Sequence, residues 1–257
     1  DLFDQYGTDA VRYWSASGRP GVDTAYSEDQ MKVGRKLANK LLNVTKFVLT
    51  FPEADASIPL ADAVTDPVDL SMLAKLDEVI AEATAGFEAF DYARALDRTE
   101  SFFWWFCDNY VELVKGRAYN SRGPEAANSA LRALREALGS VQRLFAPMIP
   151  FATEEAWSWW NTNSVHAASW PVPSALTGDA TLIDPIIDTL AHVRRAKTEA
   201  KQSQKAAVES LVVTAPAALH AAVIAGDGDL RDAGSIATVS LVEGDGFSCA
   251  ITLAPTD

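Results

Sequence analysis

Residues 101–119 read SFFWWFCDNYVELVKGRAY, and this stretch decides the class of fold. Phe102, Phe106, Tyr110 and Leu113 recur at the spacing of one face of an α-helix. The five successive aromatic residues 102–106 add bulky side chains around the rest of that helix. Because a helix that is apolar on all sides is normally surrounded by other helices, the stretch predicts the central member of a helical bundle.

The flanking sequence supplies the other helices of this bundle. Residues 70–87 keep apolar residues at helical spacing, and so do residues 125–145. A last bundle helix is predicted within residues 153–160, TEEAWSWW, and a first one within residues 31–50. The Pro-rich connection that follows Trp170 ends the helical pattern.

A change in the sequence pattern after Trp170-Pro171 predicts a second domain. A helix is expected over residues 183–205, followed by three β-branched, alternating strands at residues 209–214, 236–242 and 247–253. The loop Glu243-Gly244-Asp245-Gly246 predicts a hairpin between the last two strands. The chain is thus predicted to be mainly α, with a tail of a preceding segment at 1–28, a helical bundle at 29–172 and a small α+β domain at 178–257.

Composition limits the function classes. The 257 residues carry a formal net charge of −13, and 48% are hydrophobic, which suffices for a substantial core. We find neither a long apolar run nor a signal-peptide pattern, so a soluble, cytoplasmic protein is expected. The two cysteines and three histidines are scattered, and no phosphate loop or nucleophile motif occurs. No catalytic residue, metal site or disulfide is therefore predicted.

The stretch 31–50, MKVGRKLANKLLNVTKFVLT, reverses the charge of the chain, with five Lys or Arg residues and no acid. On a helix, its polar residues fall within an arc of about 140°, beside an apolar arc that can be buried. The candidate residues for contact with a polyanion on this polar arc are Lys32, Arg35, Lys36, Asn39, Lys40, Asn43 and Lys46. Residues 52–100, in contrast, hold twelve acids and three bases, so a polyanion should avoid them.

A second set of cations could extend the same charged side: Lys115, Arg117, Arg122, Arg194, Arg195, Lys197 and Lys201. Two alternatives remain open for the basic helix. It could be a solvated face without a partner, or the docking face of a helical protein-interaction module that binds an acidic protein.

Several motifs together resemble one family. The strings YGTDAVRYWSAS (6–17) and RKLANKLLNVTKFVL (35–49) are similar to the segment that enters the anticodon-binding domain in class I aminoacyl-tRNA synthetases for valine, leucine and isoleucine. The later strings FFWWFCDNYVELVKGRAY (102–119), LFAPMIPFATEEAW (144–157) and SVHAASWP (164–171) resemble later helices of that domain in the same order. Residues 192–208 and the strands after them resemble the small domain behind the bundle.

The resemblance is closest to the valyl enzymes, and an isoleucyl or another class I enzyme is the alternative. It implies a tRNA-binding fragment, valine-specific, whose parent is a ligase that uses ATP and Mg²⁺. The catalytic and editing domains of such an enzyme are not recognisable in these residues, so no cofactor and no catalysis are expected of the fragment itself. Asn39 and Asn43 would contact base edges, and Lys36, Lys40 and Lys46 would contact phosphates.

Overall fold

The computed structural model describes residues 2–255. The chain forms two compact units, and each unit consists of three segments of the sequence. Unit 1 contains the residues up to 55 with 73–107 and 131–176, and unit 2 contains 56–72, 108–130 and the residues from 177 onward. The division at 176/177 falls in the predicted linker, whereas the assignment of 56–72 and 108–130 to the C-terminal unit differs from the predicted linear order.

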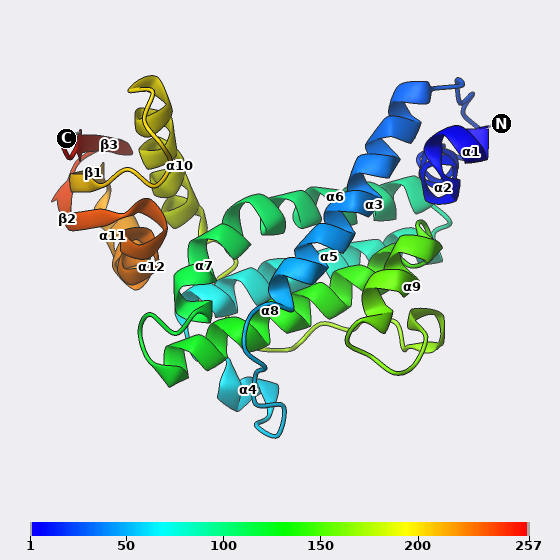
Figure 1. The fold of residues 1–257 in the computed structure, drawn as a ribbon, viewed down its shortest axis with the longest axis horizontal. Helices are drawn as coiled ribbons and strands as arrows, with labels where there is room; N and C mark the ends of the chain where they lie inside the picture. The colour runs from blue at the N-terminus through cyan, green and yellow to red at the C-terminus, as the bar shows by residue number, and fades with distance from the viewer. Residues whose placement is uncertain (1, 256–257) are drawn as a thin grey trace. The chain divides into compact units, whose positions relative to one another are not determined.

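Unit 1 is helical, as the periodicity predicts (Figure 1). Its first elements are α1 (Leu2–Tyr6), α2 (Thr8–Ala16) and the long α3 (Glu28–Val48). The later parts of α5 (Pro67–Glu88) and α8 (Pro124–Phe145) follow, together with α6 (Tyr92–Trp105), α9 (Pro150–Ser158) and the short 3₁₀ helix η2 (Val165–Ala167). The predicted bundle helices are thus confirmed as elements.

The core of unit 1 is built from the apolar rows of these helices. Leu37 and Leu41 of α3 are fully buried, as are Leu134 and Leu138 of α8. Gly34 allows α2 and α3 to approach closely, because a Cβ atom at this position would lie 2.6 Å from the Cβ atom of Tyr13.

The aromatic stretch differs in detail from the prediction of one continuous, fully enclosed helix. It is divided into α6, the π-helical turn η1 (Phe106–Tyr110) and α7 (Val111–Ala118). Phe103 and Phe106 are buried, but Trp104 and Trp105 are only half-buried. The run of five aromatics therefore exceeds what the core can enclose, and two indoles reach the surface.

Unit 2 combines α4 (Leu60–Ala63), the first turns of α5 and α8, and α7 with the C-terminal elements. These are α10 (Asp184–Glu199), β1 (Val208–Ala215), α11 (Ala217–Ala225), α12 (Asp227–Gly234), β2 (Ile236–Glu243) and β3 (Ser248–Leu253). The predicted helix that begins near residue 183 ends six residues early, at Glu199. Among residues 2–255, no helix combines the length and the apolar character that crossing a bilayer requires.

The three predicted strands are present, but the predicted hairpin is wrong. The strand order is β2-β1-β3, so β2 and β3 do not pair with each other. The pairing of β1 with β2 is parallel, and that of β1 with β3 is antiparallel. The reason is that α11 and α12 connect β1 to β2 as a crossover, which places β2 on one edge of β1 and leaves the other edge to β3.

Candidate nucleic-acid interface

The polar arc of α3 is the candidate interface, and the apolar arc fixes its orientation. Ser27 caps the helix, because its hydroxyl accepts a hydrogen bond from the backbone N–H of Gln30 at 3.2 Å. On the apolar arc of this helix, Leu37, Leu41, Val44 and Val48 are buried and Val33 is half-buried. Burial of this row turns the opposite side of the helix toward solvent.

The seven candidate residues of α3 all lie on the accessible side. Six of them are exposed and Lys40 is half-buried; the exposed six are Lys32, Arg35, Lys36, Asn39, Asn43 and Lys46. The helix begins with Glu28 and Asp29, three residues before the acid-free stretch. The tertiary structure thus presents as one surface the residues that the sequence placed on one arc.

These side chains differ in how far they are already engaged. The ammonium of Lys32 pairs with Asp29 at 2.9 Å, and this hydrogen bond raises the pKa of Lys32. Arg35 donates to the carbonyl oxygen of Gln5 at 3.3 Å. Within residues 2–255, Lys36 and Lys46 take part in no hydrogen bond or ion pair. These two cations are the ones most available to a phosphate.

Lys40 connects the interface to α6. Its Nζ atom lies 5.6 Å from the centroid of the Trp104 ring, within the range of a cation–π contact. The Nε1 atom of Trp104 donates to Glu100 at 3.1 Å. The sequence predicts Trp104 as a core residue and does not single out Glu100, although the i, i+4 spacing of the two residues is a local signal for their contact.

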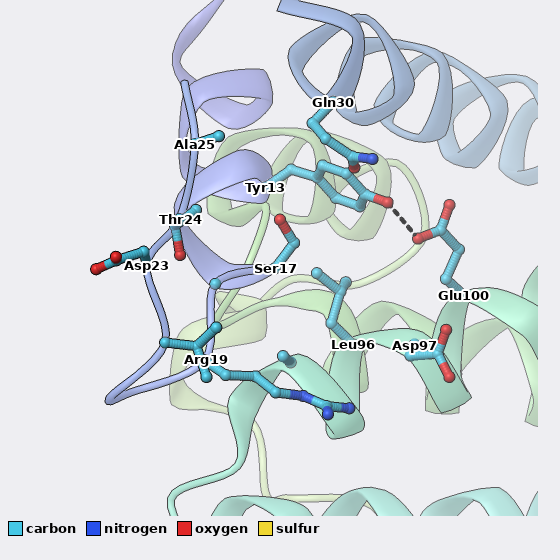
Figure 2. A pocket seen from close by; sticks show the side chains of 13 residues that line it. Tyr13, Ser17, Arg19, Asp23, Thr24, Ala25, Gln30, Leu96, Asp97 and Glu100 are labelled. Carbon is cyan, nitrogen blue, oxygen red and sulfur yellow. Dashed lines mark hydrogen bonds between the residues drawn. The ribbon is translucent and has the colours of Figure 1, made fainter. Parts of the chain in front are cut away.

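A hollow of about 670 Å³ adjoins the N-terminal part of α3 and carries the opposite charge (Figure 2). Asp23, Asp97 and Glu100 line it, together with Arg19 and Tyr13. Tyr13 donates to Glu100 at 2.6 Å, and burial together with this bond raises the pKa of Tyr13. With three carboxylates and one guanidinium among its lining side chains, the hollow has a net negative charge, which disfavours a phosphate there.

The second set of cations does not form one surface. The assignment of Arg117 and Lys197 as tRNA contacts is wrong, because both side chains are buried. The ammonium of Lys197 donates to the carbonyl oxygens of Gln204 and Gly234, at 2.9 and 2.7 Å. It therefore holds the end of α10 to the loop after it and to the end of α12.

The remaining members of the second set vary in their pairing. Lys115 pairs with Glu112 at 2.7 Å, and Arg194 donates to the backbone oxygen of Asp108 at 3.2 Å. Arg195 and Lys201 are exposed. These two remain predicted contacts, whereas Lys115 and Arg194 would have to exchange a partner within the protein for a phosphate.

Arg117 is the centre of a buried charge cluster in unit 2. It forms two 2.7 Å hydrogen bonds to Asp69 and two longer ones to Asp229, at 2.8 and 3.1 Å. Asp66 lies 3.2 Å from the same guanidinium, and Arg122 also pairs with Asp229. Asp69 further accepts hydrogen bonds from Tyr110 and Ser129, at 2.7 and 2.6 Å.

The cluster links segments of unit 2 that lie far apart in the sequence. It joins the first turns of α5 and α8 to α7 and α12. Because an unpaired charge is costly in the protein interior, each buried charge here is stabilised by its partners. Burial also raises the pKa of Asp229 to about 6, because desolvation outweighs the attraction of Arg117 and Arg122. Residues 227–229 form the first turn of α12, and Asp229 has a structural role there.

Comparison with known families agrees with this architecture. Residues 69–212 match the family described as the anticodon-binding domain of tRNA ligase. The match covers more than half of the chain, so the chain belongs to the family of anticodon-binding domains of tRNA ligases. The matched region begins after α3 and extends into β1.

The similar curated proteins are valine–tRNA ligases. The chain is 49% identical to the valine–tRNA ligase of Salinispora arenicola over 95% of its own length, and 46% identical to that of Leifsonia xyli over 100%. It spans about a third of these relatives, 31% of each. A fold likeness with a TM-score of 0.50 links 84% of the chain to 23% of an Agrobacterium radiobacter LeuRS, solved in a ternary complex with tRNA and LeuAMS; the 17% identity limits this likeness to the fold.

Proposed function

We propose that this chain is the anticodon-binding part of a longer valine–tRNA ligase, and that it binds the anticodon arm of tRNA through the polar face of α3. The observation that carries the proposal is the set of exposed cations on α3 in a chain of net charge −13. A cationic face on an acidic body directs a polyanion to one place. The family match and the similar valine–tRNA ligases support the tRNA partner.

The valine specificity rests on the names of the similar ligases. We further propose that amino-acid activation, with its ATP and Mg²⁺, belongs to the part of the ligase outside these residues, and that the protein works in the cytoplasm. On this view the chain orients the tRNA and performs no bond-making step. Phosphate contacts from Lys36 and Lys46 set the register, and the amides of Asn39 and Asn43 are positioned for base edges.

The test measures tRNA affinity at several salt concentrations. Replacement of Lys36 and Lys46 by Gln should weaken binding and lower the slope of log affinity against log salt by roughly 1.4 to 1.8, since each lost phosphate contact contributes about 0.7 to 0.9. Both side chains are exposed, so the fold should be unchanged. Arg94→Gln is the matched control, because Arg94 is exposed on α6 within the acidic segment.

Two outcomes would contradict the proposal. Equal salt slopes for the double variant and the wild type would mean that α3 is a solvated face. Equal affinity for valine, isoleucine and leucine tRNA transcripts would remove the valine assignment, while leaving tRNA binding in place.

A further inference from the structure

Among the residues that the structure describes, the half-buried Arg143 of α8 is held only by uncharged oxygens. Its Nε atom donates to the carbonyl oxygen of Gly139 at 3.0 Å, and its Nη2 atom donates to the hydroxyl of Ser140 at 3.3 Å. The Nη1 atom donates to the carbonyl oxygen of Ser169 at 3.4 Å. A guanidinium carries five N–H groups, so two of them are left for a ligand after these three bonds. The contacts orient the group without neutralising it.

This guanidinium has no counter-ion within residues 2–255. No carboxylate of that range lies within ion-pair distance, and burial lowers the pKa of Arg143, which the attraction of Glu136 offsets only in part. Burial disfavours the charged form of Arg117 as well, yet the three aspartates around it raise its pKa. Desolvation of a charge is costly unless an opposite charge compensates it. The contrast between the two arginines points to an anion that Arg143 receives from a ligand.

A second arginine of α8 shares this feature. Arg135 is half-buried, and its Nε atom is buried without a hydrogen-bond partner in the described part of the chain. It forms no ion pair there either. Arg135 precedes Arg143 by eight residues, roughly 12 Å along the helix, so the two can meet separate anions of one extended ligand. A nucleic acid backbone presents such a series of anions.

The arginines of α8 adjoin the candidate interface on α3. The side-chain amide of Gln142 donates to the hydroxyl of Thr45 at 3.0 Å, so α3 and α8 touch at these two residues. The two helices run in roughly opposite directions (Figure 1). In an antiparallel pair, the residues that follow the two contacting positions turn toward the same side of the contact. Lys46 and Arg143 are these following residues, so the two cations share one side.

We propose that Arg143 and Arg135 of α8 bind phosphates of the same tRNA that Lys46 of α3 contacts. The inference rests on the proposed function and extends its interface from α3 to α8. The two remaining N–H groups of Arg143 can meet a phosphate as a pair, which is the strong form of this contact. Because three hydrogen bonds already hold the side chain, it loses less freedom when it binds.

The experiment measures the tRNA affinity of the full chain at several salt concentrations, together with its urea unfolding. Arg143→Gln should weaken binding about tenfold, because it removes charge-assisted hydrogen bonds, and should lower the slope of log affinity against log salt by about 0.7 to 0.9. Arg135→Gln should lower the slope by a similar amount. The double variant should lower it by roughly 1.4 to 1.8, because the two positions are far enough apart to act independently.

Two further variants separate a phosphate contact from a structural role. Arg143→Lys keeps the cation but loses the fixed fork of donors, so it should bind less tightly than the wild type and keep the wild-type salt slope. Arg98→Gln is the matched control, because Arg98 is also half-buried in unit 1 but pairs with Glu82. It should leave the salt slope unchanged, even where it lowers stability.

The failures can be told apart. If the wild type binds no tRNA, the proposed function is wrong and this inference falls with it. If the double replacement of Lys36 and Lys46 lowers the salt slope, but Arg143→Gln and Arg135→Gln bind like the wild type, α8 is no part of the interface and the proposed function stands. If Arg143→Gln and Arg143→Lys weaken binding equally, with an unchanged slope and equal losses of stability, Arg143 only ties Ser169 to α8 and the inference is overturned.

Discussion

Replacement of Arg117 by Met should destabilise the protein strongly and affect tRNA binding only through stability. The Arg117 side chain is fully buried and faces three carboxylates, those of Asp66, Asp69 and Asp229. Removal of one partner from a buried ion pair leaves an uncompensated charge and costs about 3–5 kcal/mol. Asp69 would keep only the neutral donors Tyr110 and Ser129. A loss of this size is a large part of the roughly 5–15 kcal/mol that stabilises a typical protein.

The cost should depend on pH in a defined direction. Burial already raises the pKa values of Asp66 and Asp229, and loss of the opposing attraction of Arg117 raises them further, so the native state binds more protons than the unfolded chain as the pH falls. Stability therefore rises on acidification, and the difference between variant and wild type should be smaller at pH 5 than at pH 7. Urea unfolding followed by far-UV circular dichroism at both pH values measures this difference.

Arg122→Met is the matched control for Arg117→Met. The Arg122 side chain is about one third exposed and shares Asp229 with Arg117, so its loss should cost about 1 kcal/mol after allowance for solvent screening. A loss below about 1 kcal/mol for Arg117→Met at pH 7, or an equal loss at both pH values, would refute this account of the cluster. A stable Arg117→Met protein with reduced tRNA affinity would instead restore Arg117 as an RNA contact.

Two further changes test the electrostatics and the packing of single elements. The pKa of Asp229, raised to about 6 by burial, lies above its unfolded value of about 3.9, so this group's contribution is most favourable at low pH and is lost as the pH rises through 6. Through this group, the wild-type unfolding free energy should fall by about 1.3 kcal/mol between pH 5 and pH 7, and Asp229→Asn should show a smaller fall in the same urea titrations. Asp9 accepts hydrogen bonds from the backbone N–H groups of Phe151 and Ala152, at 3.2 and 2.7 Å, where α9 begins. Asp9→Ala should lower the unfolding free energy by about 1 kcal/mol, measured by thermal or urea unfolding. The same change at the exposed Asp23 should lower it by almost nothing. Equal effects of the two changes would show that Asp9 does not cap α9.

The helical elements could be predicted because they follow from local periodicity. The apolar row of α3 predicted which side of that helix is buried, and the charge pattern predicted which side is exposed. Both predictions need only helix geometry and the tendency of apolar residues to leave water. The motif strings identified the family for the same reason, since they combine local patterns in a fixed order.

The sheet topology could not be predicted in this way. A short loop rich in glycine favours a hairpin, but the loop between β2 and β3 connects strands that both pair with β1. Which edge of β1 each strand occupies depends on the crossover through α11 and α12. That choice depends on packing between residues distant in sequence, so no local signal records it.

The sequence by itself determined the helical class, the basic face of α3 and the family, because each depends on the order and spacing of neighbouring residues. Only the tertiary structure decided which cations are free to meet a ligand. Arg117 and Lys46 both appear in the sequence as cations, but Arg117 is buried and paired with Asp66, Asp69 and Asp229, whereas Lys46 is exposed near the end of α3. A residue's charge is a local property, whereas its burial and its partners are set by segments more than a hundred positions away, such as Asp229 for Arg117.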